Sequence, residues 1–172
     1  MTIHTTHPFA DPEPDPARRL RGRLGGAVTL WTAGTDDRRA GLTVSSLMLA
    51  NGEPPQLLAL VDPDSELLDV LTESARAVVQ LLSWADRALA EVFAGTAPAP
   101  GGAFRQAEFL PTGWGPRLAT ATTYAHAVLV GEEPVGWSTL VTCRIEEAFV
   151  GDEVGPALGH RRGRFFPLGS GA

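Results

Sequence analysis

The stretch Ala40-Gly41-Leu42-Thr43-Val44-Ser45-Ser46 alternates apolar residues with small hydroxyl residues, which is typical of a half-buried β-strand. Eight residues later comes Pro54-Pro55, which cannot donate to a sheet ladder, and then the apolar run 57–61. We therefore predict two strands, at 40–46 and 57–61, separated by the proline pair. Hydroxyls and exposed backbone amides at the end of a strand can hold a flat polar ring and an anionic tail.

The segments around this stretch extend it into a mainly β pattern. The β-branched run 28–32 predicts the first arm of a hairpin, with a turn at Asp36-Asp37 and 40–46 as its second arm. Further strands are predicted at 77–82, 118–130 and 138–149, and the aromatic and arginine-rich segment 158–168 closes the chain.

Short helices are predicted between some of these strands. Asp15 is a candidate N-cap, with Pro16 at the first helical position of a helix at 17–24 that ends at Gly25-Gly26. After a turn at 62–65, Leu67, Leu68 and Leu71 form an apolar helix face. Ser83 with Asp86 is a start similar to a capping box for a helix at 84–93.

Six or more strands with two or three short helices predict a mainly β protein of the α+β class with a barrel-like sheet. A parallel doubly wound sheet is disfavoured, because the opening strands form hairpins without intervening helices. Residues 1–14 have no apolar period, so we expect a disordered tail there and a single domain at 15–172.

The overall charge limits the classes of function. The formal net charge of −6 argues against a nucleic-acid surface, which would need a basic stripe. All 14 basic residues are arginine, so Schiff-base chemistry and a P-loop lysine are excluded.

The cysteine, histidine and apolar content limits the kind of site and the compartment. The single cysteine, Cys143, is expected to be a buried, inert thiol, and no zinc site is expected, because the four histidines are scattered. With no apolar N-terminal run and no membrane span, we expect a cytoplasmic protein.

The order of these segments resembles that of the flavin reductase family: hairpin, Thr-x-Ser-Ser, Pro-Pro, apolar strand, short helix and buried strand. The resemblance covers roughly residues 17–168. It implies a homodimeric split β-barrel that binds FMN or FAD and reduces it with NAD(P)H. In the family, free reduced flavin often serves a separate monooxygenase, so a monooxygenase partner is implied as well.

The resemblance also implies which residues contact the flavin. They lie on the hydroxyl-bearing strand, at the end of the next strand, and on the buried strand where the family often has Asn. In this chain they are Ala40, Gly41, Leu42, Thr43, Ser45, Ser46, Val61, Asp62, Ser65 and Gln80.

The sequence departs from the family pattern at two places. Glu66 and Leu67 stand where the family commonly has phosphate-binding Ser or Arg, so Arg38, Arg39 and Arg76 become candidates to hold a phosphate. Gly136-Trp137-Ser138 stands where many members carry Gly-Asp-His. The residues implied to line the face where the hydride donor enters are Trp137, Ser138 and His160, the last within a segment that looks like the family's closing strand.

Three functions follow from these observations. The first is an NAD(P)H-dependent flavin reductase. The second is a family member that binds flavin or another planar ligand without turnover, suggested by the two departures. The third is a dimeric interaction module without a small-molecule site, in which apolar strands build only a core and a subunit interface.

Overall fold

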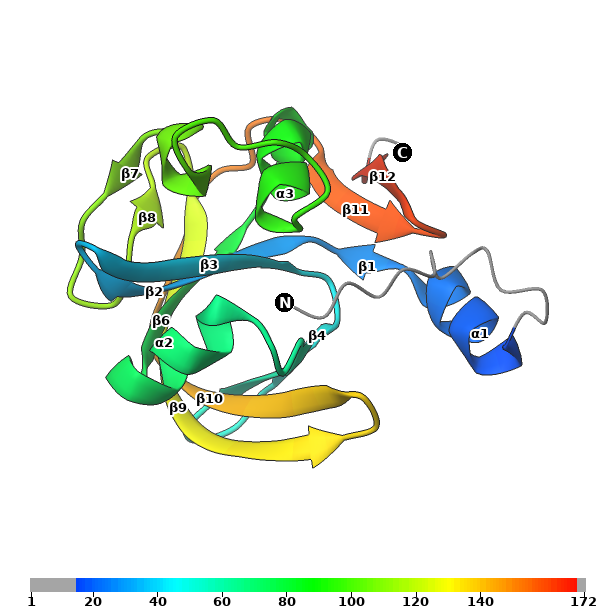
Figure 1. Cartoon of the computed structure of the whole chain (residues 1–172), viewed down its shortest axis with the longest axis horizontal. Coiled ribbons are helices and arrows are strands. Elements are labelled where there is room, and N and C mark those ends of the chain that lie inside the picture. The colour runs from blue at the N-terminus through cyan, green and yellow to red at the C-terminus, as the bar shows by residue number, and fades with distance from the viewer. Residues whose placement is uncertain (1–14, 170–172) are drawn as a thin grey trace.

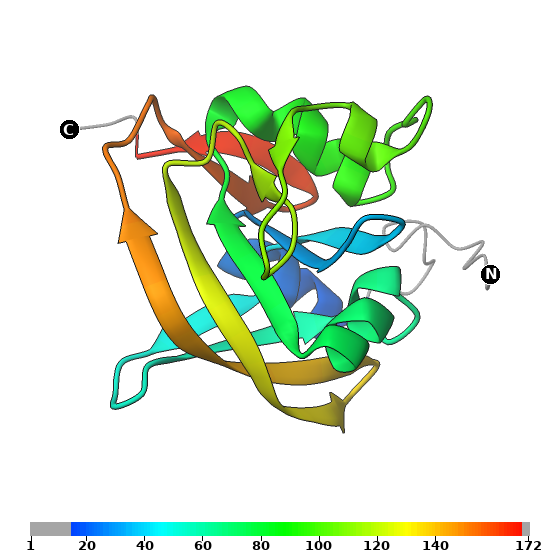
Figure 2. The same ribbon diagram turned by 90° about the vertical axis from the view of Figure 1, so that its left-hand side faces the viewer.

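A strongly curled antiparallel sheet of seven strands forms a half-barrel. The computed structural model describes residues 15–169, so the tail predicted at 1–14 lies outside the described residues. In spatial order the strands are β3 (Arg38–Val44), β2 (Thr29–Thr35), β6 (Arg76–Leu81), β9 (Thr123–Val135), β10 (Ser138–Val150), β5 (Gln56–Val61) and β4 (Leu47–Ala50). The half-barrel has β2 and β3 above helix α2 (Glu66–Ser74) and the β9–β10 hairpin below it in Figure 1, and its outer face is toward the viewer in Figure 2. The prediction of a mainly β split barrel is confirmed.

The interior of the half-barrel is a single apolar cluster closed by helix α2 (Glu66–Ser74). Trp31 of β2 is its largest fully buried side chain, and Leu67, Val70 and Leu71 of α2 pack into the same cluster. Helix α2 lies between β3 and the long β9–β10 hairpin (Figure 1). Burial of these apolar groups is the main term that stabilises the curl.

The opposite face of β2 and β6 is covered by helix α3 (Arg87–Phe93) and a second sheet. That sheet has the order β1 (Gly26–Ala27), β11 (Ala157–Arg161) and β12 (Arg164–Leu168). The segment 158–168, predicted as one closing strand, is therefore a hairpin. Arg162 and Gly163 both adopt positive φ, of 54° and 74°, which gives the tight turn that joins β11 to β12.

The predicted helix signals hold, with one refinement. Helix α1 (Pro16–Leu24) begins at Pro16, and the Asp15 carboxylate accepts a hydrogen bond from the backbone N–H of Ala17 at 2.9 Å. Ser65 caps α2. The capping box of Ser83 and Asp86 is present but opens a 3₁₀ turn, η1 (Trp84–Asp86), and α3 follows it.

Several strand boundaries differ from the prediction. The strand predicted at 40–46 ends at Val44, and the unpredicted strand β4 follows after Ser45 and Ser46. Strand β9 begins at residue 123, not 118, because 103–118 forms a short 3₁₀ turn, η2 (Ala103–Arg105), and a small hairpin, β7 (Phe109–Leu110) with β8 (Arg117–Leu118). Edge and two-residue strands bury too little apolar surface to leave a periodic signal.

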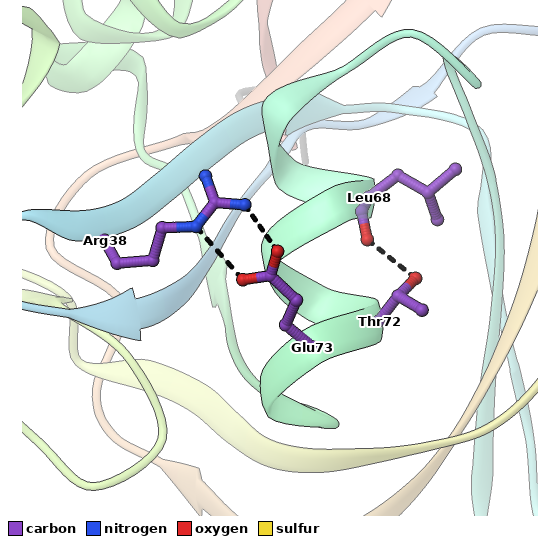
Figure 3. Close-up of polar contacts among 4 residues, drawn as sticks. All are labelled: Arg38, Leu68, Thr72 and Glu73. Carbon is purple, nitrogen blue, oxygen red and sulfur yellow. Dashed lines mark hydrogen bonds and ion pairs between the residues drawn. The ribbon is translucent and has the colours of Figure 1, made fainter.

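Helix α2 is tied to the barrel by a surface ion pair (Figure 3). The Arg38 guanidinium donates from Nε to Glu73 Oε2 at 3.0 Å and from Nη2 to Glu73 Oε1 at 2.6 Å. The hydroxyl of Thr72, the residue before Glu73, donates to the Leu68 carbonyl one turn earlier in the helix at 2.8 Å. The pair of hydrogen bonds between Arg38 and Glu73 lowers the pKa of the Glu73 carboxyl, and the hydrogen bond from Arg38 is the main cause.

Candidate functional site

The link between β3 and β4 lies beside the end of β5 and the start of β10. The backbone N–H of Leu60 donates to the Ser46 carbonyl at 3.0 Å, and the Ser46 hydroxyl donates to the Leu60 carbonyl at 2.9 Å. In the ladder between β5 and β10, Val61 is opposite Thr139. The fold thus brings Ser46, Val61 and Ser138 to one edge of the sheet, although they come from three separate parts of the sequence.

Ser45 lies next to His160 across the short strand β1. Gly26 pairs directly with His160, so their Cβ directions point to the same side of that sheet. A Cβ added to Gly26 would meet the Ser45 carbonyl oxygen at 3.3 Å. Ser45 therefore lies on the face of β1 and β11 from which the His160 side chain projects.

Helix α1 lies near both the β9–β10 hairpin and the face of β1 and β11 that carries His160. The Arg18 guanidinium lies 5.0 Å from the centroid of the Trp137 ring, at the tip of the β9–β10 hairpin. Burial, and to a lesser extent the charge of Arg21, lower the pKa of His160. In Figure 1 the helix stands apart from the half-barrel at the free end of the β11–β12 sheet. We call the surface outlined in this way the candidate site; its residues are Ser45, Ser46, Asp62, Trp137, Ser138 and His160. Val61 lies beside it at the end of β5, but its side chain is buried in the interior cluster.

Ser65 adjoins the candidate site, but its hydroxyl is used by the fold. It donates to the Asp62 carbonyl at 2.7 Å and accepts from the backbone N–H of Leu68 at 3.3 Å, as the cap of α2. The Asp62 carboxylate accepts from the Asp64 N–H at 2.9 Å. These bonds fix the turn after β5 and hold Asp62 at the end of the strand, where its side chain is exposed.

The first half of the predicted flavin-contacting strand faces other parts of the protein. Ala40 is buried in the interior cluster, and Leu42 packs against it. A Cβ at Gly41 would lie 2.7 Å from the Phe93 ring, so this glycine allows α3 to approach closely. The Thr43 hydroxyl donates to the Ala90 carbonyl at 2.8 Å. None of these four side chains faces the candidate site.

Gln80 is wholly buried, which does not agree with the prediction that it contacts a flavin. Its side-chain oxygen accepts from the backbone N–H of Leu118 at 2.5 Å, and its amide nitrogen donates to the Thr32 hydroxyl at 3.2 Å. The reason is strand parity: Gln80 is opposite Leu30, on the face of the sheet that packs under α3. The amide therefore anchors the chain around Leu118.

The three arginines predicted to hold a phosphate are engaged elsewhere. Arg38 pairs with Glu73, Arg39 lies over the Phe104 ring at 4.8 Å, and Arg76 lies over the Trp114 ring at 5.1 Å. The sequence analysis did not consider the arginines of α1 and of the β11–β12 turn as phosphate ligands. The available signal was their density, since two short segments far apart in the chain hold half of all the arginines.

The polar groups of the candidate site suit a flat ligand with hydrogen-bonding edges. The exposed Ser45 hydroxyl makes no hydrogen bond within residues 15–169, and neither does the half-buried Ser138 hydroxyl. Trp137 is 80% exposed and offers a ring face for stacking. Free hydroxyls, an indole and nearby guanidinium groups are the donor set that a flavin nucleotide needs.

An apolar cavity of about 300 Å³ lies next to the candidate site, and its lining includes Leu47, the residue that follows Ser46. Leu57 and Val79 belong both to its lining and to the interior cluster, so the cavity lies at the open end of the half-barrel. Its outer lining includes Leu47, Met48, Leu49, Leu81, Phe149 and Val150. Ser46 precedes Leu47, and the predicted strand therefore borders this cavity without lining it.

Two further predictions concern the cysteine and membrane spans. The prediction that Cys143 is buried is confirmed: it lies in the interior cluster, where burial raises the pKa of its thiol to about 12. Among residues 15–169, no helix has the length and apolar character needed to cross a bilayer.

Comparisons with known proteins agree with this architecture. The family model described as "Flavin reductase like domain" matches residues 21–169. The FMN reductase (NADH) RutF 2 of Methylorubrum extorquens (strain PA1) is 30% identical over 147 residues, which are 80% of this chain and 81% of that protein.

Two solved structures share the fold at lower identity. The NADH:FAD oxidoreductase SgcE6 of Streptomyces globisporus, in complex with NAD and FAD fragments, aligns with a TM-score of 0.78 at 21% identity, over 91% of this chain and 93% of that one. The styrene monooxygenase flavin reductase of Pseudomonas putida S12 also has a TM-score of 0.78, at 18% identity, over 92% of this chain and 100% of that one.

Proposed function

This chain belongs to the flavin reductase like family, and we propose that its candidate site binds FMN or FAD for reduction by NAD(P)H. The observation that carries the proposal is the gathering of Ser45, Ser46, Asp62 and Ser138 from three strand ends. The protein is a flavin-binding oxidoreductase. The interpretation as an interaction module without a small-molecule site does not fit this family.

The residues of the candidate site bind the flavin and the nicotinamide nucleotide and orient their rings. The flavin, when bound, supplies the acceptor for the hydride of the nicotinamide nucleotide. Ser45 presents its hydroxyl to the polar edge of the ring, whereas the Ser46 hydroxyl, which donates to the Leu60 carbonyl, can only accept a hydrogen bond from the ligand. Asp62 borders the sugar-alcohol chain. Trp137, Ser138 and His160 line the face on which the donor stacks. Because hydride transfer needs alignment of two rings, no protonated side chain is required at Ser138.

His160 contributes a neutral imidazole to this face. Burial and, to a lesser extent, Arg21 lower its pKa, which favours the neutral ring, and a neutral imidazole can both donate and accept a hydrogen bond. A neutral group does not compete with the arginines for the phosphates of the ligand. Its role is therefore to position the donor.

Two measurements test the proposal. Fluorescence titration of the purified protein with FMN, FAD and riboflavin should give saturable binding, and steady-state assays should show flavin-dependent oxidation of NADH or NADPH at about 1 per second or faster. Binding without turnover would instead identify the second function, a flavin-binding protein without reductase activity. Absence of binding to all three flavins would contradict both.

We propose that the protein is a homodimer in which the second copy of the chain covers the apolar cavity. Met48 and Leu49 on edge strand β4 are 67% and 55% exposed, and Val150 is 85% exposed. An exposed apolar patch around an open barrel end is typical of a subunit interface. Leu49→Glu should shift the protein from dimer to monomer in sedimentation equilibrium. Leu110→Glu, at an exposed leucine on β7, is the matched control and should leave the mass unchanged.

The reduced flavin is the proposed product for a partner enzyme. The similar protein from Pseudomonas putida is described as the flavin reductase of a styrene monooxygenase, and this chain is proposed to supply a monooxygenase in the same way, in the cytoplasm. A flavin-dependent monooxygenase separated from this protein by a dialysis membrane should still turn over when NADH is present on the reductase side. Turnover only on direct mixing would contradict supply by free diffusion.

A further inference from the structure

We propose that the arginines of α1 and of the β11–β12 hairpin form a binding site for the phosphate groups of the nucleotide whose ring occupies the candidate site. This inference rests on the proposed function. The shared chemistry is a phosphate or diphosphate, which belongs either to the flavin or to the nicotinamide nucleotide.

The first observation is the concentration of positive charge. Residues 15–27 and 157–169 contain seven arginines and one aspartate, a net charge of +6, whereas the whole chain carries −6. We call this set the arginine corner; its members are Arg18, Arg19, Arg21, Arg23, Arg161, Arg162 and Arg164. Guanidinium groups bind phosphate oxygens in two-pronged fashion, which makes such a cluster suited to a diphosphate.

The second observation is that the fold assembles the two arginine segments. The Arg161 guanidinium donates from Nε to the Arg23 carbonyl at 3.0 Å, and the backbone N–H of Arg162 donates to the Gly22 carbonyl at 2.7 Å. These bonds lock the end of α1 against the β11–β12 turn (Figure 1). Helix α1 buries no side chain of its own, so packing alone does not account for its position.

The third observation is contact between the arginine corner and the candidate site. Arg18 lies over the Trp137 ring, and Arg21 is near enough to His160 to lower the pKa of its imidazole. A planar ring stacked near Trp137 and His160 would therefore have guanidinium groups at one end. Phosphates attached to that ring would reach them without crossing the half-barrel.

The fourth observation argues against a phosphate at the other end of the candidate site, near the turn between β5 and α2. The turn after β5 and the first turn of α2 carry four exposed carboxylates, at Asp62, Asp64, Glu66 and Asp69, with no basic residue among them. Glu66 and Asp69 already complement the positive end of the helix dipole. A phosphate placed there would face like charge. The ligand is thus oriented with its phosphates toward the arginine corner.

The test is a double variant, Arg21→Gln with Arg164→Gln, which removes one guanidinium from each segment. The matched control is Arg87→Gln with Arg105→Gln, which changes the net charge equally and lies on α3 and η2. The measurements are dissociation constants for FAD, FMN and riboflavin by fluorescence, and KM for NADH. Circular dichroism verifies that α1 is retained, and Arg164→Gln alone, outside the helix, repeats the test.

The expected result is an about tenfold weaker interaction with one phosphate-bearing ligand, while riboflavin, which has no phosphate, binds as before. If the dissociation constants of FAD or FMN rise, the flavin phosphates occupy the arginine corner. If only KM for NADH rises, the donor phosphates do.

Three outcomes would overturn the inference. The first is that neither value changes in the double variant, and the second is that riboflavin weakens equally. The third is that Glu66→Gln tightens FMN while the double variant binds normally, which would place the phosphate at α2. In each of these cases the unaltered protein would still bind flavin and oxidise NADH, so the proposed function would stand. The proposed function itself would fail only if the unaltered protein did not bind flavin or oxidise NADH.

Discussion

Two polar regions of this protein use similar side chains in opposite ways. Under α3, the buried Thr32 and Gln80 bond to each other, and Gln80 also holds the backbone of Leu118. At the β3–β4 link, Ser45 is exposed and its hydroxyl has no partner within residues 15–169. Buried polar groups must be satisfied by the protein itself, whereas exposed donors at a strand end remain available for a ligand. The first region serves the fold and the second serves binding.

The largest effect is expected from a substitution that breaks the hydrogen bonds of the buried region. Gln80→Ala leaves the Leu118 N–H buried without an acceptor, so the free energy of unfolding should fall by about 1–3 kcal/mol. Urea denaturation followed by tryptophan fluorescence measures this change. The flavin dissociation constant of the folded protein should stay unaltered. A specific loss of flavin affinity at full stability would instead return Gln80 to the binding site.

The second effect breaks the exposed region. Ser45→Ala should leave the unfolding free energy within about 0.5 kcal/mol of the parent, since this hydroxyl bonds to no group in the described part of the chain. Flavin affinity should fall by roughly two- to tenfold, the value of one hydrogen bond. Fluorescence titration with FMN and FAD checks it. Thr43→Val is the matched control, because the Thr43 hydroxyl bonds to Ala90 and should affect stability alone.

A smaller effect sharpens the comparison at His160. Arg21→Gln should raise the pKa of His160, but the pKa should stay below the usual histidine value, because burial, the larger cause, remains. In the parent protein the lowered pKa means that the unfolded chain binds the proton more readily, so stability falls as the pH drops through the histidine range. The variant should lose less stability there. An NMR titration assigned with His160→Gln measures the pKa; an unchanged value would place Arg21 away from the imidazole.

The smallest effect concerns the exposed pair between Arg38 and Glu73. The pKa of Glu73 is lowered in the folded state, so the pair stabilises the protein above the carboxyl titration range and ceases to do so as the pH falls through it. Arg38→Gln should therefore lower Tm slightly at pH 7 and have no effect at about pH 3, since exposed pairs contribute little. Calorimetry at the two pH values makes the comparison. An equal loss of Tm at both would point to packing of the arginine stem.

The sequence indicated the β class, the Asp15 cap of α1, the capping box at Ser83 and the hairpin around Asp36-Asp37, because these depend on residues close together in the chain. It failed at two hairpins that are just as local, because their strands are too short or too exposed to show an apolar period. The closing segment 158–168 reads as one strand, yet positive φ at Arg162 folds it back on itself. Strand β4 carries no periodic pattern of its own and exists through its pairing with β5.

The candidate site shows the same division. The family resemblance implied that Ser45, Ser46, Val61 and Asp62 contact the flavin. In the structure Ser45, Ser46 and Asp62 are exposed just beyond strand ends, whereas Val61 is buried. Ala40 and Gln80 were misjudged, because the side that a strand residue faces depends on which partners cover each face of the sheet.

By itself, the sequence determined the longer elements, their order and the resemblance to a family, because propensity, caps and hydrophobic period act over a few residues. Only the tertiary structure decided which hydroxyls remain free and that arginines 140 residues apart, such as Arg21 and Arg161, form one positive surface. Charge and hydrogen bonding act through space, and the distance between two segments is set by the sheet that joins them.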